Sequence, residues 1–168
     1  MSPLFTDSRV LNRGIISQLN IGTNFMYKLL TIISLLAVTG CATTPMPFAA
    51  AKQAPPERLL AFQNKPAGSS GTLFVTRDAG FLGGGCYYAV SINGTTAARL
   101  DVGEKSAFFV SPGEILIRAG RDPQGKALCA LGQDDWTQRD TLIRENETKY
   151  FRLSIDANGK TDIQRAEQ

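Results

Sequence analysis

The sequence predicts an all-β fold: a small antiparallel β-sandwich or partly open barrel of seven or eight strands over residues 71–168, preceded by a signal peptide and a flexible tether. Apolar and polar residues alternate over 95–102 and 149–155, which is the period-two pattern of half-buried strands. Asn93-Gly94 and Asn158-Gly159 punctuate such runs, and Asn-Gly is the strongest short signal for a β-hairpin. Regularly spaced short strands with turns between them are typical of sandwiches and barrels.

Runs rich in β-branched and aromatic residues locate the strands. They predict strands at residues 71–77, 86–92, 95–102, 106–110, 115–120, 149–155 and 161–165. The segment 122–147 is less regular, and we expect one strand around 127–131 and another around 141–144. The alternation places Ala98 inward and Ala97 outward. The inward positions together predict a core of Leu73, Val75, Tyr88, Val90, Ile92, Leu100, Val102, Phe108, Val110, Ile115, Ile117, Phe151, Leu153 and Ile155.

The N-terminal region has the pattern of an export signal. Lys28 follows Met26 closely and residues 29–38 are mostly apolar, so residues 26–40 predict a signal peptide. The apolar run is too short to span a bilayer, which takes about 20 such residues. Residues 1–25 are polar and precede an ideal start at Met26. We interpret them as a mis-annotated extension; the alternative is a genuine long positive region before the signal.

Cys41 distinguishes this signal from an ordinary one. The tetrapeptide Val38-Thr39-Gly40-Cys41 resembles the lipobox of bacterial lipoproteins. The resemblance implies that the chain is cleaved before Cys41 and that this cysteine is lipidated, with acyl chains such as palmitate. Three chains exceed the two lipid signals that stable anchoring takes. Enterobacterial lipoproteins retained in the inner membrane tend to have aspartate next; because Ala42 stands here, the resemblance implies the outer membrane, facing the periplasm, with the inner membrane as the alternative.

The segment that follows predicts a linker. Residues 41–70 are rich in Ala, Pro, Gln and Lys and hold few large apolar side chains, a composition that suits a flexible tether. Within it, residues 55–62 predict a short helix, because proline suits a first helical turn and Glu57 suits its positive end.

Cys86 and Cys129 remain once Cys41 is assigned to lipid. An even pair of cysteines in an exported protein predicts a disulfide. A redox-active pair is the alternative, but the spacing is far from Cys-x-x-Cys.

The composition excludes several function classes. Histidine is absent, which rules out Ser-His-Asp and Cys-His catalysis, histidine-ligated zinc and an imidazole pH switch. No motif indicates a cofactor or metal. Removing residues 1–40, which hold Arg9, Arg13, Lys28 and Asp7, lowers the formal charge from +3 to +1. The mature chain therefore has no basic footprint for nucleic acid.

The glycine-rich segment 80–85 invites comparison with a phosphate-binding loop. It lacks the Lys-Ser/Thr of that motif and leads into a predicted strand, whereas phosphate loops open a helix. A flexible connecting loop is therefore the prediction.

The order of the predicted strands and turns resembles a known family. The elements are residues 71–77 (GTLFVTR), 90–94 (VSING), 100–103 (LDVG), 110–114 (VSPGE) and 147–151 (ETKYF). They are similar to an uncharacterised group of short bacterial lipoproteins with a β-rich domain akin to carbohydrate-associated PEGA-type modules, over roughly residues 57–165. That family commonly has histidine after the Pro-Gly, where Glu114 stands here. The resemblance implies a fold and no agreed activity.

Three aromatic residues are candidates for a binding surface. Tyr87, Phe109 and Tyr150 fall on strand faces opposite to the predicted core. If they are exposed together, they form a patch of the kind that marks an interaction site; otherwise they belong to the core.

The cluster Asp134-Asp135-Trp136 is the other candidate, because paired carboxylates beside an indole could bind a cation or a sugar. A solvated loop is the alternative. We expect a non-catalytic binding or structural module that is anchored in the membrane and contacts a periplasmic protein or a cell-wall glycan. The competing hypothesis is a small hydrolase of cell-wall glycans that uses Asp134, Asp135 or Asp140, since paired carboxylates cleave glycosidic bonds without histidine.

Overall fold

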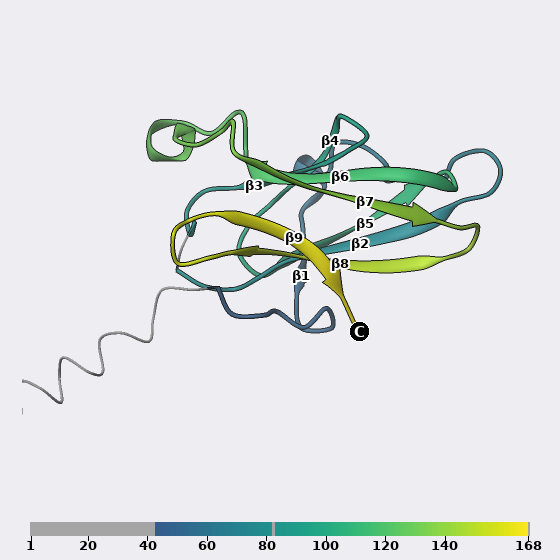
Figure 1. Cartoon of the computed structure of the whole chain (residues 1–168), viewed down its shortest axis with the longest axis horizontal. Helices are drawn as coiled ribbons and strands as arrows, with labels where there is room; N and C mark the ends of the chain where they lie inside the picture. The colour runs from purple at the N-terminus through teal and green to yellow at the C-terminus, as the bar shows by residue number, and fades with distance from the viewer. Residues whose placement is uncertain (1–42, 82, 168) are drawn as a thin grey trace, which may run out of the picture. The chain divides into compact units, whose positions relative to one another are not determined.

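The computed structural model describes residues 43–81 and 83–167, and within them the chain is an all-β sandwich (Figure 1). Two sheets pack face to face around an apolar core. The strands are β1 (Lys52–Gln53), β2 (Gly71–Arg77), β3 (Tyr88–Ile92), β4 (Thr95–Leu100), β5 (Glu104–Val110), β6 (Gly113–Arg121), β7 (Trp136–Ile143), β8 (Thr148–Ile155) and β9 (Thr161–Ala166). Two short 3₁₀ helices, η1 (Pro56–Arg58) and η2 (Ala127–Ala130), lie in the connections.

The predicted β-sandwich is confirmed, with a mixed sheet on one side. One sheet has five strands in the order β1-β5-β2-β8-β9, and the other has four in the order β4-β3-β6-β7. Most neighbours are antiparallel, but β1 runs parallel to β5, and β2 runs parallel to β8. The described residues hold nine strands instead of the expected seven or eight, because β1 comes from the segment predicted as a tether.

Strand alternation places the core as the sequence predicts. Every predicted core residue is buried except Val102, which is half-buried in the turn after β4. Ala97 was expected outside and is buried instead. The pairing of β3 with β4 shifts by one residue between Val90 and Ser91, so both Ala97 and Ala98 join the core. The predicted turn at Asn93-Gly94 forms between these strands, with positive φ at both residues.

Residues 43–62 of the segment predicted as a flexible tether over 41–70 pack on the sheets instead. Residues 43–53, which we call the strap, cross the outer face of the five-stranded sheet (Figure 1). Thr44 pairs with Ala79 near the end of β2, and β1 pairs with β5 at the other side of that sheet. Ala51 is buried at the end of the strap. A composition of small residues and prolines therefore builds an ordered layer here, because its backbone groups find partners on the sheet.

The chain then passes from one sheet to the other. The one or two helical turns predicted over 55–62 form as the single turn η1, and Leu59 bridges Ala98 on β4. Phe109 on β5 donates its backbone N–H to the carbonyl of Phe62 at 2.8 Å. Edge strands expose unpaired backbone groups, and this crossing segment covers such groups on both sheets.

Phe48 holds the strap to the sheet. Its ring meets Phe74 and Tyr150 edge to face, at centroid distances of 4.7 and 5.2 Å. Lys105 lies over the same ring at 4.2 Å and donates to the Phe48 carbonyl at 2.7 Å. The strap is thus attached through both a side chain and a backbone group.

Phe48→Ala is expected to lower the free energy of unfolding by about 2 kcal/mol, because it removes two aromatic contacts and leaves a gap on a half-buried site. Urea denaturation followed by circular dichroism measures the change. Gln53→Ala, at an exposed position of β1, is the matched control and should cost less than about 0.5 kcal/mol. Equal, negligible effects for both variants would show that the strap does not pack in solution.

Candidate functional site

The described chain begins at Thr43, two residues after the proposed lipidation site; Cys41 itself lies outside the described residues. Thr43 donates its backbone N–H and its hydroxyl to the Ile155 carbonyl at 3.2 and 3.1 Å. Its hydroxyl oxygen also accepts the Ile155 backbone N–H at 3.0 Å. The chain is therefore fixed to the end of β8 almost as soon as it leaves Cys41. No helix within the described part of the chain is long and apolar enough to cross a membrane.

The disulfide predicted between Cys86 and Cys129 has the required geometry. The two Cα atoms lie 5.4 Å apart, within the range of about 4.4–6.8 Å that a disulfide spans. Cys86 precedes β3, and Cys129 lies in η2, where a strand was expected over 127–131. The bond joins two loops at the same end of the sandwich (Figure 1).

The glycine-rich loop connects β2 to β3 and is organised around a buried cation. Arg77 is buried and donates to the carbonyls of Gly83 at 2.7 Å and Cys86 at 2.7 Å. A third bond reaches the Leu100 carbonyl at 2.8 Å. Burial lowers the pKa of Arg77 to about 10, so it remains charged at neutral pH. The loop directs carbonyl oxygens toward a cation, whereas a phosphate-binding loop directs backbone N–H groups toward an anion.

Asp134, Asp135 and Trp136 line a cleft of about 570 Å³. Both carboxylates come from the loop that leads into β7, and the wall across from them is formed by residues 158–161 in the β8–β9 turn. Among the described residues that line the cleft, this second wall contributes an amide, an ammonium group and a hydroxyl but no carboxylate. Asp140 lies on β7 opposite Leu116 and does not line the cleft.

Trp136 fixes the loop that carries these carboxylates. Its indole N–H donates to the Gln133 carbonyl at 2.8 Å, and Arg118 lies over its ring at 5.1 Å. The ring packs against Gly120, where an added Cβ would lie 2.9 Å from the indole. The indole is therefore part of the loop's scaffold, as well as a wall of the cleft.

The three candidate aromatics do not form one surface. Tyr87 lies under Arg58 at 4.5 Å, and Phe109 lies near Lys65 at 5.7 Å. Tyr150 stacks on Phe74 with ring centroids 5.1 Å apart and sits beside the strap. Each ring is therefore packed against its own neighbour, and the common exposed patch that the sequence left open is not present.

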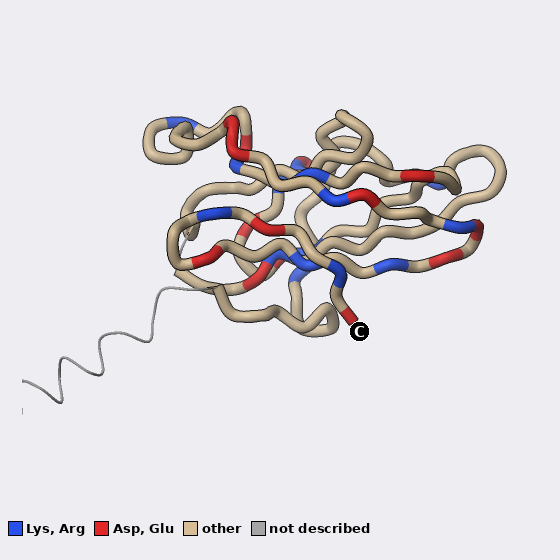
Figure 2. Tube along the Cα trace, in the orientation of Figure 1, with Lys and Arg blue, Asp and Glu red and all other residues tan. Residues whose placement is uncertain are grey.

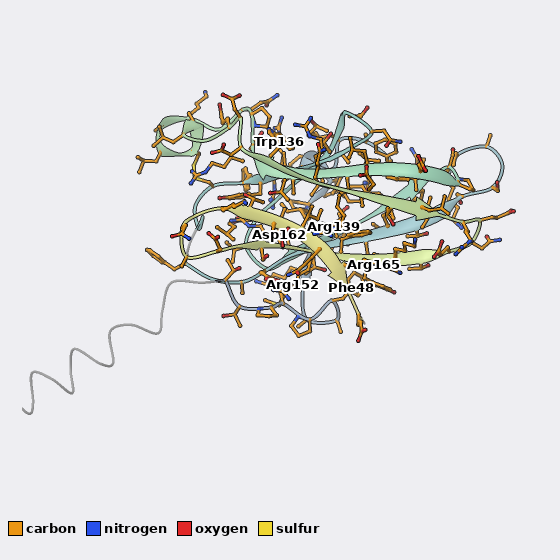
Figure 3. The ribbon with its side chains drawn as sticks, viewed as in Figure 1. Phe48, Trp136, Arg139, Arg152, Asp162 and Arg165 are labelled. Atoms are coloured by element: carbon orange, nitrogen blue, oxygen red, sulfur yellow. A yellow bond between two sulfur atoms is a disulfide. The ribbon has the colours of Figure 1, made fainter. Side chains whose placement is uncertain are left out.

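A second cavity, which we call the strap groove, lies between the strap and strands β8 and β9. Its volume is about 640 Å³. Phe48, Arg152 and Arg165, which Figure 3 labels, are among its lining residues. Most of its exposed lining is apolar, and its complete lining is Pro45, Met46, Pro47, Phe48, Ala49, Thr76, Tyr150, Phe151, Arg152, Arg165, Ala166 and Glu167. Sequence reasoning missed this groove, because one of its walls comes from the segment predicted as a tether.

Asp78 positions both the strap and an arginine of this groove. It is buried, accepts the Met46 backbone N–H at 3.2 Å and pairs with Arg152 at 2.8 Å. Burial raises the pKa of Asp78 above its ordinary value, while the Met46 N–H and Arg152 oppose that change. The Asp78 carboxylate thus links Met46 of the strap to Arg152 of β8, and both of these residues line the strap groove.

The wider surface carries mixed charge. Lysines and arginines alternate with aspartates and glutamates along the strands and loops (Figure 2). The described residues contain no group of histidine, cysteine, aspartate and glutamate side chains arranged to hold a metal ion. No protein-family model matches the chain, and no curated protein matches it either.

Proposed function

We propose that the chain is a lipoprotein of the outer membrane, anchored through lipid on Cys41, whose β-sandwich is a non-catalytic binding module with the strap groove as its ligand site. The groove is the observation that carries this proposal. Ligand sites are typically concave, mostly apolar cavities of about 300–1,000 Å³ with a few convergent polar groups, and the strap groove fits that description.

The proposed anchor and the disulfide both support a location in the cell envelope. The lipobox resemblance at 38–41 supports a location in the cell envelope, and a cysteine pair at disulfide distance suits an oxidising compartment. An anchored binding site meets envelope ligands at a raised effective concentration. The ligand is therefore expected in the periplasm.

The chemistry of the groove favours a ligand that carries carboxylates. Arg165 supplies an exposed guanidinium group, and guanidinium groups bind carboxylates through paired, charge-assisted hydrogen bonds. Arg152 supplies a second guanidinium group, whose Nε already pairs with Asp78. Phe48 and Tyr150 supply apolar walls beside them. Cell-wall glycan with its peptide side chains offers such groups, and an acidic segment of a periplasmic protein does so as well.

The carboxylate cleft supports binding better than hydrolysis. Glycosidases use two carboxyl groups that flank the scissile bond, about 5–9.5 Å apart. Asp134 and Asp135 are neighbours on one wall of their cleft, and the described residues of the facing wall contribute no carboxylate. A glycosidic bond held between the two walls would therefore have carboxyl groups on only one of its sides.

Arg165→Glu is expected to weaken ligand capture by about tenfold or more, because it replaces an attractive charge with a repulsive one at an exposed position. The measurement is cosedimentation of the purified protein with cell-wall sacculi, run beside crosslinking of the lipidated protein in intact envelopes. Arg144→Glu, exposed in the turn between β7 and β8, is the charge-matched control.

Unchanged capture by Arg165→Glu would exclude the strap groove as the site. Mass spectrometry of the membrane fraction tests the anchor separately, since the N-terminal peptide should start at a lipidated Cys41. Recovery of an unmodified Cys41 would overturn the lipoprotein proposal.

A further inference from the structure

The most exposed large apolar side chains of the described chain gather at one end of the sandwich. Phe81 is 91 % exposed, Leu128 is 76 % exposed and Leu131 is 63 % exposed. Phe81 lies in the glycine-rich loop between β2 and β3, whereas both leucines lie in the loop between β6 and β7. The Cys86–Cys129 disulfide joins the two loops, so these three side chains share one end of the domain, which we call the tip (Figure 1).

The chain leaves for its anchor from the same end. Thr43 is hydrogen-bonded to Ile155, and Thr44 exchanges backbone hydrogen bonds of 2.6 and 3.0 Å with Ala79, two residues before Phe81. A Cβ on Gly83 would lie 2.6 Å from the Ile155 side chain, so the glycine-rich loop packs directly on the residue that holds Thr43. The start of the described chain and the tip are therefore contiguous.

The covalent chain allows little distance between Thr43 and the lipid. Two residues span at most roughly 7 Å when fully extended, so no more than that length of chain separates Thr43 from the proposed lipidation site. If the strap were a free tether, the domain could stand well away from the membrane. Because the strap is packed, a lipid on Cys41 brings the tip to the bilayer surface.

We infer that the tip is a membrane-contacting surface, with Phe81, Leu128 and Leu131 inserted into the lipid leaflet that holds the Cys41 acyl chains. This inference rests on the proposed lipid anchor and adds a second point of attachment. Exposed apolar clusters on soluble domains mark protein or membrane interaction sites. The short distance between the tip and the proposed anchor favours the membrane as the partner, because acyl chains on Cys41 would hold the lipid leaflet next to these side chains.

Apolar contact is the attractive interaction at the tip, since its charges are mixed. Lys126 and Lys160 lie in the same loops as Asp134, Asp135 and Asp156, so the tip offers no strong net attraction for anionic headgroups. Shallow insertion into the headgroup and upper acyl region, about 5–10 Å deep, is the geometry that apolar side chains on an interfacial surface adopt.

The tip is also built to keep its shape. The disulfide ties Leu128 and Leu131 to the glycine-rich loop, and Arg77 bonds the carbonyls of that loop to the core. A preformed surface loses little conformational entropy when it inserts. The strands then run away from the membrane, and the turn between β7 and β8 is the far end of the domain (Figure 1).

Fluorescence quenching in membranes tests this orientation. Lipidated Phe81→Trp and Leu142→Trp proteins are purified and reconstituted into vesicles of phosphatidylethanolamine and phosphatidylglycerol with and without brominated acyl chains. Leu142 is the matched control, because it is 49 % exposed and lies at the end of β7 that is remote from the tip. The native Trp136 is common to both variants, and the wild-type signal is subtracted.

The expected result is several-fold stronger quenching of the added tryptophan in Phe81→Trp than in Leu142→Trp, with a blue-shifted emission for the former. Mass spectrometry of Cys41 in the same samples separates the two proposals. Lipid on Cys41 with equal quenching in the two variants would overturn the tip insertion and leave the anchor standing. An unmodified Cys41 would overturn both.

Discussion

A Cys86→Ser/Cys129→Ser double variant is expected to lose about 4 kcal/mol of unfolding free energy, on the chain-entropy estimate for a loop closed between cysteines 43 positions apart. Small domains have only about 5–15 kcal/mol in total, so this change removes a large share of the stability. Urea denaturation of the soluble Cys41→Ser protein, followed by circular dichroism, measures it. Comparison with and without reductant gives the same quantity from a single protein.

The loop that Cys129 belongs to explains why the disulfide should matter so much. No residue of η2 is buried, and Leu128 and Leu131 point into solvent. Besides the disulfide, a few side-chain hydrogen bonds hold the loop. Gln133 donates to the Asp122 and Gly125 carbonyls at 2.9 and 3.0 Å, Arg121 donates to the Leu128 carbonyl at 3.2 Å, and the Trp136 indole donates to the Gln133 carbonyl at 2.8 Å. Free energies of unfolding that agree within about 0.5 kcal/mol between oxidised and reduced protein would contradict the predicted contribution of the bond.

The same loop shows where sequence patterns stop being informative. The apolar run at 127–131 predicts a strand, yet it forms the short helix η2. A strand needs a neighbour to accept its backbone hydrogen bonds and a core to bury its side chains. The disulfide at Cys129 and the positive φ values of Ala127 and Gly132 turn the chain away from both. Neither the disulfide nor these backbone conformations changes the apolar–polar pattern from which strands are predicted.

Strands that bury one face, such as β8, were predictable from the sequence. Along β8, Phe151, Leu153 and Ile155 are buried while Tyr150 and Arg152 are not, and the sequence shows this alternation directly. The parallel pairing of β2 with β8 could not be predicted, since alternation defines the faces of a strand but not its neighbour.

The strap was missed for a different physical reason. Flexible linkers and ordered coverings can share a composition of Ala, Pro and polar residues. What orders the strap is a set of partners far away in the sequence, such as Asp78 for Met46 and Ile155 for Thr43. The strap groove depends on those contacts, so the sequence pointed to the carboxylate cleft and left the more apolar site unseen.

Arg77 also escaped notice in the sequence, where it is only the last residue of a predicted strand. In the structure it is buried, lies over the Tyr88 ring at 4.5 Å and donates to three carbonyls, two in the glycine-rich loop and its neighbour Cys86 and one at the end of β4. Gly83 must adopt a positive φ of 71° to present its carbonyl there, and a side chain at Gly83 would meet the Tyr88 ring. The glycine-rich loop is thus shaped by a single guanidinium.

Arg77→Met is expected to lower the free energy of unfolding by about 3–5 kcal/mol. Methionine fills much of the same volume, but it leaves the carbonyls of Gly83, Cys86 and Leu100 without their donor in a desolvated site. Arg77→Lys keeps the charge and should fall between Arg77→Met and wild type, because one ammonium group cannot reproduce the planar guanidinium fork. Arg144→Ala, at an exposed turn, is the control and should change stability by less than about 0.5 kcal/mol.

Hydrogen exchange in Arg77→Met distinguishes a local loosening of the glycine-rich loop from a loss of stability throughout the domain. If Arg77 acts by holding the glycine-rich loop, hydrogen exchange in residues 80–86 of Arg77→Met should quicken more than exchange in β6, which supplies none of the three carbonyls that accept from the guanidinium. The tip would then lose its fixed shape while the core strands remain protected. A stability loss below about 1 kcal/mol, with unchanged exchange in this loop, would mean that the loop carbonyls find other donors and that Arg77 does not organise the tip.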